Sequence, residues 1–417
     1  MPACGLDFGT SNSALALPDG TVLPVDPAAR GGADPRLLRS VLFFPQDGAE
    51  VFAGAEAIER YLDEGEGRFI QSVKSWLPSA AFRATNIRSR TFLLEELVAI
   101  VVRRLREAAM KVAGPLDEVV MGRPAVFSTE PEADALAEGR LRRAAELAGF
   151  TKVRFVIEPI AAALAYESQL SREETVLVAD FGAGTSDVTV MRLGPGRGAS
   201  TDRKGDILAS GGVYIGGDRF DAEIMRHKLL SRFGAASTYM SLTRRQPMPP
   251  DLMNKLLAWH RLSFIKDRGT LELLGRMLHT SDDVPAIRAL KDLVVHNLGY
   301  HVFRAIEAAK VRLSTETKAV IEFTDGEIRL EEPLTRAELE RFAAPLLAGL
   351  GKCVDDVHAR AGSVLVDSVF LTGGSSQMPA VRRLFEERFG PERVRTRDAF
   401  SSVAEGLGRA VKSFHSQ

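Results

Sequence analysis

Two short segments, far apart in the chain, carry the same combination of residues. Residues 5–13 read GLDFGTSNS and residues 180–187 read DFGAGTSD. Each combines an aspartate with a glycine turn that also holds Thr or Ser, and β-type residues follow, at Ala14–Leu17 and at Val188–Leu193. The pattern predicts one device, a strand–turn–strand hairpin, used twice.

The strand after each turn restricts the phosphate chemistry that the glycines can serve. In a Walker loop or a dinucleotide fingerprint the glycines open a helix, and the helix N-terminus holds the phosphate. Here a strand follows, so backbone N–H groups of two facing hairpins would hold the phosphate. Gly9, Gly182 and Gly184 have no Cβ and allow a close approach.

Three aspartates lie beside these turns: Asp7 and Asp180 at equivalent places, and Asp187 after the second turn. A carboxylate next to a phosphate is repelled unless a divalent cation lies between them. Mg²⁺ keeps several waters and accepts one or two carboxylates together with phosphate oxygens. The residues therefore predict a water-mediated Mg–ATP site. An ordinary Gly/Asp turn is the alternative for either loop alone, and the match between the two loops argues against it.

A nucleoside could bind later in the chain, where Glu307, Lys310 and Ser314 have the i, i+3, i+7 spacing of one helix face. Such a face can hydrogen-bond ribose hydroxyls and an adenine edge. Taken alone, the spacing favours an exposed i, i+3 ion pair, worth roughly 0.3 kcal/mol. Gly373-Gly374-Ser375 follows a predicted strand and is either a helix-entry turn or a wall of an adenosine site.

The elements that must position these residues alternate between strands and helices. Leu93–Val112 has helical periodicity and stops at Gly114-Pro115, and Glu132–Gly149 is a second predicted helix. A short strand at 151–157 leads to a third helix that begins after Glu158-Pro159. This alternation predicts an α/β fold, and the repeated hairpin predicts two similar halves.

The rest of the chain continues after a Gly- and Arg-rich loop. The predicted elements are that loop at 194–206, a helix from 216 to 232, several helices between 246 and 300, a helix at 302–313, β-type pieces at 319–330, a helix from Thr335, a strand at 366–371 and a closing helix.

Composition excludes several classes of protein. The 417 residues hold 54 Lys and Arg against 55 Asp and Glu, a net charge of −1, so the chain lacks the footprint of a nucleic-acid or anionic-membrane binder. Cys4 and Cys353 form no disulfide framework, which favours a reducing, cytoplasmic location, and Cys4 is expected to be a buried apolar residue. We expect no signal peptide, no membrane span and no zinc site.

Seven motifs in a fixed order resemble one family. They are GLDFGTSNS, SVKSWL around Lys74, IEPIAAALAY around Glu158, DFGAGTSDV, YIGGDRFD, IEAAKVRLS and LTGGSSQMP. Together they resemble the nucleotide-binding domain of the DnaK-type heat-shock chaperones, in the sugar kinase/actin/heat-shock ATPase superfamily. The resemblance covers nearly the whole chain. The helical insertion with Trp259-His260 and the ending DAFSSVAEG are similar to the YegD-like branch, which lacks the substrate-binding domain.

The resemblance implies an actin-like ATPase fold, made of duplicated ribonuclease H-like domains, with two lobes around a central nucleotide cleft. The resemblance implies that lobe I spans 1–172, with a core at 1–40 and 115–172 and an inserted subdomain at about 41–114. Lobe II would span 173–394, with a core at 173–220 and about 335–394 and an inserted helical subdomain at about 221–334. A closing helix at 395–417 would return to lobe I.

The resemblance also implies a role for each matching residue. Lys74 would point its ammonium at the γ-phosphate, Thr185 would lie near that phosphate, and Glu158, Asp180 and Asp187 would hold Mg²⁺-bound or attacking water. The implied nucleotide-binding residues are Gly9, Thr10, Ser11 and Asn12 in the first turn, Gly182, Ala183 and Gly184 in the second, and Gly216, Gly217, Glu307, Lys310, Ser314, Gly373, Gly374 and Ser375 around the nucleoside. Pro124 falls where the chaperones have a proline that relays nucleotide state.

Some positions depart from the family pattern. Ala183 replaces the middle glycine of the second turn, and Asn12 stands where the chaperones usually have another residue, often an aromatic one. Val311 and Gln377 stand where the chaperones have arginines around adenine, with Arg312 as a candidate substitute. These departures concern the contacts to phosphate and to the adenine ring.

The expected function is an ATP-binding switch that hydrolyses ATP slowly, a weak Mg-dependent ATPase that acts through protein partners or co-chaperones. ATP or ADP and Mg²⁺ are the implied ligands, with K⁺ as a further candidate cation. Two alternatives stay open. A small-molecule kinase would show ATP turnover that rises with one metabolite, and an actin-like filament protein would show nucleotide-dependent light scattering.

The last expectation concerns how such a protein would reach its partners. Only four residues follow the closing helix at about 403–413, too few for a peptide-binding domain, so the chain is expected not to clamp peptides by itself. The helical insertion at about 244–300 departs most from the chaperone pattern and is the candidate docking surface.

Overall fold

The structure is a computed structural model that describes residues 3–30, 34–64, 66–167, 170–195, 203–241, 243–257, 265, 267–396 and 402–415. The chain divides into two compact units. Unit 1 contains residues 1–214, 350–377 and 381–417, and unit 2 contains residues 215–349 and 378–380. These units group the chain by its contacts, whereas the two predicted lobes stay a prediction.

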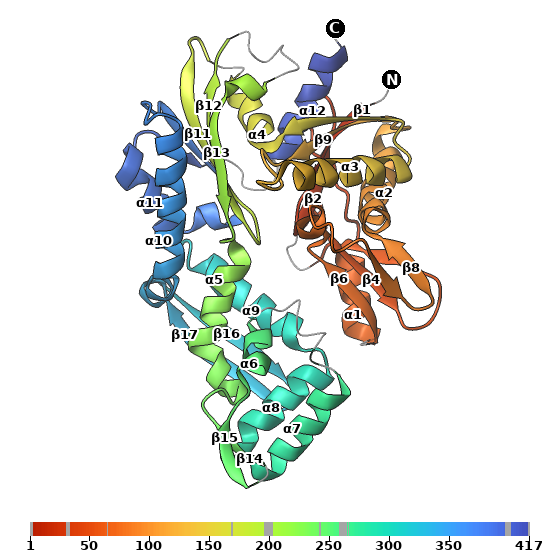
Figure 1. Ribbon diagram of the computed structural model, residues 1–417, viewed down its shortest axis with the longest axis vertical. Coiled ribbons are helices and arrows are strands. Elements are labelled where there is room, and N and C mark those ends of the chain that lie inside the picture. The colour runs from red at the N-terminus through yellow and green to blue at the C-terminus, as the bar shows by residue number, and fades with distance from the viewer. Residues whose placement is uncertain are drawn as a thin grey trace. The chain divides into compact units, whose positions relative to one another are not determined.

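Unit 1 contains two five-stranded sheets with the same topology (Figure 1). In each sheet the first strand lies between an antiparallel second strand and a parallel fourth strand, and the third and fifth strands extend the two edges. The strand order of the first sheet is β10 (Lys152–Ile157), β9 (Glu118–Arg123), β1 (Ala3–Phe8), β2 (Asn12–Ala16), β3 (Leu38–Arg39). The strand order of the second sheet is β19 (Val394–Thr396), β18 (Ser368–Gly373), β11 (Glu174–Phe181), β12 (Ser186–Leu193), β13 (Ile207–Val213). The repeated topology confirms the α/β fold with two similar halves.

Helices cover both faces of the first sheet. Successive side chains of each strand point to opposite faces, so apolar residues on either face can pack against a helix. On one face Cys4 and Leu6 pack in a core with α2 (Leu94–Ala113) and α3 (Pro131–Leu147). On the other face, Val120 packs with α4 (Glu158–Glu167) and α12 (Ser402–His415). The alternation fixes the faces on which the strand ends present their polar side chains.

Helix α4 packs against both sheets. Ala161 belongs to the core of the first sheet, while Ile160 and Ala163 pack with Val176 and Val178 of the second. A helix that is apolar on several sides is suited to such burial. Glu158 is the first residue of α4, so it is held close to both five-stranded sheets.

Helix α12 packs on β1 and α4 (Figure 1), and two of its glycines lie very close to neighbouring backbone. A Cβ on Gly408 would lie 2.3 Å from the Leu17 carbonyl oxygen, and one on Gly406 would lie 1.8 Å from the Ala161 carbonyl oxygen. Any side chain at these two positions would separate the backbones, so the glycines are required by the packing.

Smaller elements complete unit 1. They are β4 (Val41–Pro45), β5 (Phe52–Ala53) and β6 (Gly67–Gln71) in a three-stranded sheet, β7 (Ala84–Ile87) and β8 (Arg90–Leu93) in a hairpin, α1 (Gly54–Glu64), α11 (Pro379–Phe389), and the 3₁₀ turns Val73–Trp76, Lys204–Asp206 and Gly374–Gln377. Helix α2 ends at Gly114, which has a positive φ of 78°, so the predicted stop is confirmed.

Unit 2 is mainly helical. Its elements are α5 (Gly217–Ile224), β14 (Thr238–Ser241), β15 (Arg244–Pro247), α6 (Pro250–Leu256), α7 (Arg268–Thr280), α8 (Val284–Val295), α9 (Gly299–Arg312), β16 (Lys318–Asp325), β17 (Ile328–Thr335) and the first part of α10 (Arg336–Arg360). Several helices between 246 and 300 were expected and are present. Trp259 and His260 lie outside the described residues, as does most of the predicted loop at 194–206.

Three sequence-based details of unit 2 were wrong. The helix expected from 216 to 232 is α5 followed by a π-type turn at Met225–Leu229 and a 3₁₀ turn at Leu230–Phe233. The β14–β15 hairpin was not predicted, because its second strand has no β-type residues. Ser314 lies in the turn after α9 and not on the helix, which ends at Arg312.

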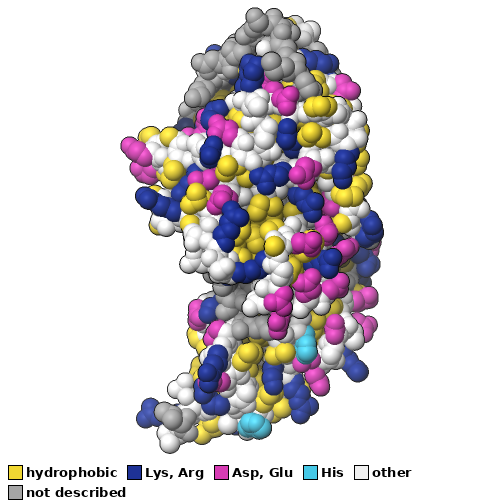
Figure 2. Space-filling model, turned by 90° about the vertical axis from the view of Figure 1, so that its right-hand side faces the viewer, with side chains coloured by type: hydrophobic (Ala, Val, Ile, Leu, Met, Phe, Trp, Pro, Cys, Tyr) yellow, Lys and Arg dark blue, Asp and Glu magenta, His cyan; other side chains and the backbone are white. Residues whose placement is uncertain are grey.

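The surface carries charges of both signs. On the face in Figure 2, Lys and Arg side chains lie among Asp and Glu side chains, in keeping with the net charge of −1. No helix in the described part of the chain is long and apolar enough to cross a membrane. Cys4 is buried, which confirms the prediction of a buried apolar residue, and this burial raises the pKa of its thiol to about 12.

Candidate functional site

The two predicted hairpins match residue by residue. In the first, Phe8 pairs with Ser13, and in the second Phe181 pairs with Ser186, with turns of equal length between them. The register places Asp7 opposite Ala14 and Asp180 opposite Asp187. Asp7 and Asp180 therefore occupy equivalent positions, as predicted, and only the second hairpin carries two facing carboxyls.

Asp180 and Asp187 are direct cross-strand neighbours, which brings their side chains to the same face of the sheet. Burial, together with the charges of Glu158, Asp187 and Asp7, raises the pKa of Asp180 to about 8. Burial and Glu158 likewise raise the pKa of Asp7 to about 7 and that of Asp187 to about 6. The four carboxyl groups thus share one buried environment.

Lys74 lies among these carboxyls. Its Nζ is 2.8 Å from Glu158 Oε1, and the two side chains are only 12% and 11% exposed. Burial alone would lower the pKa of Lys74, but the charges of Glu158, Asp7 and Asp180 outweigh it and raise the pKa. One ammonium therefore faces four carboxyl groups, of which Asp7, Asp180 and Asp187 have raised pKa values.

The oxygen donors suit a hard divalent cation such as Mg²⁺. Within the described ranges, however, no three Asp, Glu, His or Cys side chains form a group that could hold a metal ion by themselves. A cation here would need oxygen atoms from water and phosphate in addition to the protein's carboxyls. The assignment of Mg²⁺ to Asp7, Asp180 and Asp187 stays a prediction.

Two glycines that the sequence analysis did not single out make room for these acids. A Cβ on Gly212 of β13 would lie 2.5 Å from Asp187 Oδ1, and a Cβ on Gly122 of β9 would lie 2.9 Å from Glu158 Cγ. Glycine inside a strand marks a close approach, which is the signal that could have identified both.

The two turns differ in how their glycines are used. A Cβ on Gly9 would lie 2.1 Å from the Asn12 carbonyl oxygen, so the first turn itself requires glycine. Gly184 faces open space, whereas a Cβ on Gly182 would lie 3.3 Å from the Thr185 carbonyl oxygen, a tight contact that requires a small shift. Thr185 Oγ1 lies 3.4 Å from Asp187 Oδ2, which places its hydroxyl beside the carboxyl cluster. Ala183 lies between the two glycines, where its side chain is only partly buried.

Gly373, Gly374 and Ser375 lie next to the second hairpin. Gly373 pairs with Phe181, and a Cβ on it would lie 2.1 Å from the Phe181 carbonyl oxygen. Its φ of +84° also favours glycine. Both observations require glycine at position 373, and the 3₁₀ turn that follows begins at Gly374.

The other residues that are predicted to bind the nucleoside lie in unit 2. Lys310 Nζ lies 2.8 Å from Asp221 Oδ1 and donates to the Gly217 carbonyl at 3.3 Å. Gly216 caps α5, which begins at Gly217. Asp221 is buried, and burial raises its pKa although Lys310 opposes the shift. Asp221 was missed from the sequence, although it closes the YIGGDRFD motif.

Glu307 lies on the outer part of α9. It accepts a hydrogen bond of 2.9 Å from Arg304 Nη1, and the two side chains are 36% and 47% exposed. The spacing alone suggested a pair between Glu307 and Lys310, yet Lys310 pairs with Asp221. A ribose could therefore meet the Glu307 carboxylate without first breaking a buried ion pair.

We expect Glu307→Ala to weaken ADP and ATP binding alike, by about ten-fold, because a charge-assisted hydrogen bond to ribose would be lost. Isothermal calorimetry with both nucleotides measures this. Arg304→Ala is the matched control, since it removes the exposed ion pair but keeps the carboxylate, and it should leave both affinities unchanged. Unchanged affinities in Glu307→Ala would return the residue to a surface role.

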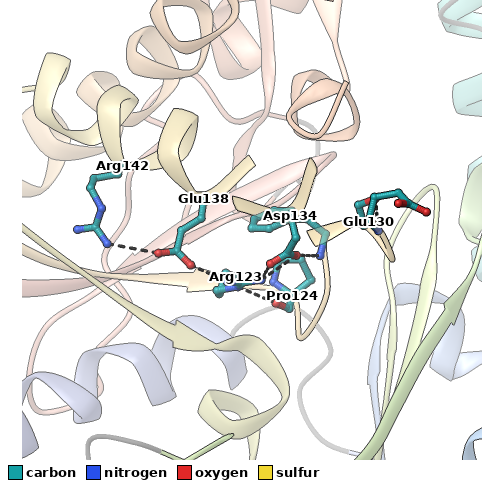
Figure 3. Close-up of polar contacts among 8 residues, drawn as sticks. Arg123, Pro124, Glu130, Asp134, Glu138 and Arg142 are labelled. Carbon is teal, nitrogen blue, oxygen red and sulfur yellow. Dashed lines mark hydrogen bonds and ion pairs between the residues drawn. The ribbon is translucent and has the colours of Figure 1, made fainter. Parts of the chain in front are cut away.

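Pro124 follows β9 in a loop held by a polar network (Figure 3). Arg123 donates from Nη2 to both carboxylate oxygens of Asp134, at 2.9 and 2.7 Å, and from Nε to the Pro124 carbonyl at 3.1 Å. Asp134 also accepts the Phe127 N–H at 2.6 Å. Burial would raise the pKa of Asp134, but Arg123 and the Phe127 N–H outweigh it and lower it.

Arg123 also reaches Glu138, which lies one turn along α3 from Asp134. Its Nη1 donates to Glu138 Oε2 at 2.5 Å, and Arg142 Nη2 donates to Glu138 Oε1 at 3.4 Å (Figure 3). The network joins the end of β9 to the first turns of α3 and fixes the loop of Pro124 between them. The relay role of Pro124 is not tested by these contacts.

Comparisons with known proteins point to one family. A family model described as "Hsp70 protein" matches residues 73–246 and 296–413, well over half of the chain. The chain is 27% identical over 414 residues to the chaperone protein DnaK of Elusimicrobium minutum, covering 96% of this chain and 56% of that protein. DnaK of Thermosipho africanus is 27% identical over 414 residues (96% and 57%), and DnaK of Thermotoga petrophila is 27% identical over 422 residues (98% and 58%).

The matches cover only part of the relatives and leave one stretch of this chain unmatched. The chain spans between 56% and 58% of the length of these curated relatives. The stretch between the two matched ranges, 247–295, contains α6, α7 and α8 and coincides with the helical insertion expected from the sequence.

Proposed function

The chain belongs to the Hsp70 family, and we propose that it binds Mg–ATP and ADP and hydrolyses ATP slowly. The observation that carries the proposal is the buried group of Asp7, Glu158, Asp180 and Asp187 around Lys74, beside two matching glycine turns. A structural role alone gives no reason to bury four carboxyl groups with a single ammonium, since burying unpaired charge costs free energy.

In this proposal the turns bind the phosphates. Backbone N–H groups of Gly9–Asn12 and Gly182–Thr185 would donate to phosphate oxygens, and the Lys74 ammonium would lie against the terminal phosphate. When bound, Mg²⁺ would neutralise phosphate charge and polarise the transferred group. Asp7, Asp180 and Asp187 would hold its water ligands.

Lys74 and Glu158 would have separate tasks. Phosphoryl transfer depends mainly on positioning and on stabilising charge, so the ammonium would stabilise the charge that develops on the terminal phosphate. The Glu158 carboxylate, held by Lys74, would accept a hydrogen bond from the attacking water and orient it. The Thr185 hydroxyl would donate to a terminal phosphate oxygen.

Glu307 and Lys310 would bind the nucleoside, and Gly216 and Gly217 would leave room for it. We also propose that nucleotide state acts on protein partners, and that α6, α7 and α8, which fall between the matched parts of the family model, form a docking surface. A reducing, cytoplasmic location agrees with two free cysteines.

Calorimetry tests the proposal directly. We expect the purified protein to bind ATP in the presence of Mg²⁺, and a chelator to weaken that binding by at least ten-fold, because the buried carboxyls then face the triphosphate without a cation. Equal ATP affinity with and without chelator would contradict the site. Turnover that rises steeply with one metabolite would favour a kinase, and nucleotide-dependent light scattering would favour a filament.

A further inference from the structure

Ser40, which the sequence analysis did not single out, lies against the first glycine turn. It follows β3 directly and is only 2% exposed. Its Oγ donates to the Gly9 carbonyl at 2.8 Å, and its backbone N–H donates to the Ser11 carbonyl at 2.9 Å. One residue therefore holds two carbonyl groups of the same turn.

A second buried serine supports Ser40. Ser13 Oγ lies 2.8 Å from Ser40 Oγ, and Ser13 is 1% exposed. A hydroxyl has one proton to donate, and that of Ser40 goes to Gly9. Ser13 must then be the donor and Ser40 the acceptor, so the hydroxyl of Ser40 is fixed in the orientation that holds the turn.

Fixing these carbonyls also fixes the amides that follow them. In a trans peptide the C=O and the next N–H point in opposite directions within one plane. Because the Gly9 and Ser11 carbonyls point to Ser40, the N–H groups of Thr10 and Asn12 point away from it. Two amides of one turn that point to the same side can donate together to an anion.

We propose that Ser40 is a positioning residue that sets the first turn for phosphate binding, with Ser13 holding Ser40 in place. The inference rests on the proposed nucleotide binding and names a residue outside the set that contacts nucleotide. Removing the Ser40 hydroxyl should loosen the turn while the backbone bond from Ser40 to Ser11 remains. Removing the Ser13 hydroxyl should have the same effect to a smaller degree.

The test compares Ser40→Ala and Ser13→Ala with Ser237→Ala. Ser237 is the matched control: it is 6% exposed, and its hydroxyl donates to a glycine carbonyl, that of Gly234, at 2.7 Å. The probes are ADP with Mg²⁺ and AMP, measured by calorimetry, and amide hydrogen exchange of a peptide covering residues 8–14 in the nucleotide-free protein. Thermal unfolding reports whether each variant is folded.

We expect Ser40→Ala to lose about ten-fold or more in ADP affinity, and Ser13→Ala to lose less, from the loss of a buried hydrogen bond. AMP affinity should stay unchanged, because the resemblance to the chaperones implies that Thr10, Ser11 and Asn12 line the β-phosphate, which AMP lacks. Hydrogen exchange over 8–14 should rise in both variants. Ser237→Ala should match the unchanged protein in all three measurements.

Several results would overturn the inference: unchanged ADP affinity in Ser40→Ala, an equal loss for ADP and AMP, or the same loss in Ser237→Ala. An unfolded Ser40→Ala leaves the decision to Ser13→Ala, read by the same rules. A wild-type protein that binds no ADP would refute the proposed function instead. In that case, hydrogen exchange over residues 8–14 decides whether Ser40 fixes the turn. Unchanged exchange in Ser40→Ala would refute the positioning role of Ser40 as well.

Discussion

Replacing Lys74 by alanine is expected to lower the rate of ATP hydrolysis by at least a hundred-fold, on the order of 2.7 kcal/mol in activation free energy. The variant removes the one ammonium that faces Glu158, Asp7 and Asp180. The Glu158 carboxylate is then left without this positive partner, next to a developing negative charge. ADP affinity should barely change, because ADP lacks the phosphate that Lys74 is proposed to contact. Single-turnover hydrolysis and ADP calorimetry measure the two effects separately.

Two further variants separate chemistry from folding. Lys228→Ala breaks a lysine–glutamate pair of similar length, 3.2 Å to Glu338, in unit 2, and should leave hydrolysis unchanged. Thr185→Val removes only a hydroxyl and should lower hydrolysis by about ten-fold, or ~1.4 kcal/mol. Hydrolysis at the normal rate in both Lys74→Ala and Thr185→Val would refute the assigned roles.

Asp180→Asn is expected to stabilise the nucleotide-free protein while it weakens Mg–ATP binding. The folded-state pKa of Asp180 is raised to about 8 from an ordinary 3.8, so between these values the folded protein holds a proton that the unfolded chain has released. Stability then falls as pH rises from about 4 to 8. Asparagine cannot ionise, so the variant escapes this loss, and its Tm at pH 8 should exceed that of the wild type by several degrees, roughly 5 °C.

Thermal unfolding between pH 6 and 8, with and without Mg–ATP, checks this prediction. The difference in Tm between variant and wild type should grow with pH in the nucleotide-free protein, and Mg–ATP should raise the Tm of the wild type more. Asp282→Asn is the control, because hydrogen bonds from Thr238 lower the pKa of that exposed carboxyl. A variant that is less stable than the wild type at pH 8 would contradict the argument.

Local sequence patterns predicted the elements that carry the site. The two segments with Asp7 and Asp180 gave the hairpins, and the helix before Gly114 ended where expected. These features depend on neighbouring residues, namely glycine turns, strand alternation and helix stops. The same local information failed for Ser314, because a helix-like spacing continues past the residue at which α9 ends.

Contacts between distant residues could not be derived from spacing. Lys74 and Glu158 are 84 residues apart, and only the resemblance to a family placed both at the phosphate. The pair of Lys310 with Asp221, and the bonds from Ser40 to the first turn, link separate elements in the same way. Gly122 and Gly212 were also overlooked, since the acids they accommodate lie on neighbouring elements.

The packing of α12 on β1 has a consequence for how the chain acquires its structure. Gly5 of β1 fits against the backbone of Gly408, so the first strand of unit 1 reaches its final surroundings only after residue 408 has been synthesised. Unit 2, drawn almost entirely from 215–349, requires much shorter loop closures and can complete its core while translation continues. Unit 1 would then close last, with apolar residues such as Val120 and Ala161 exposed to solvent until α12 docks.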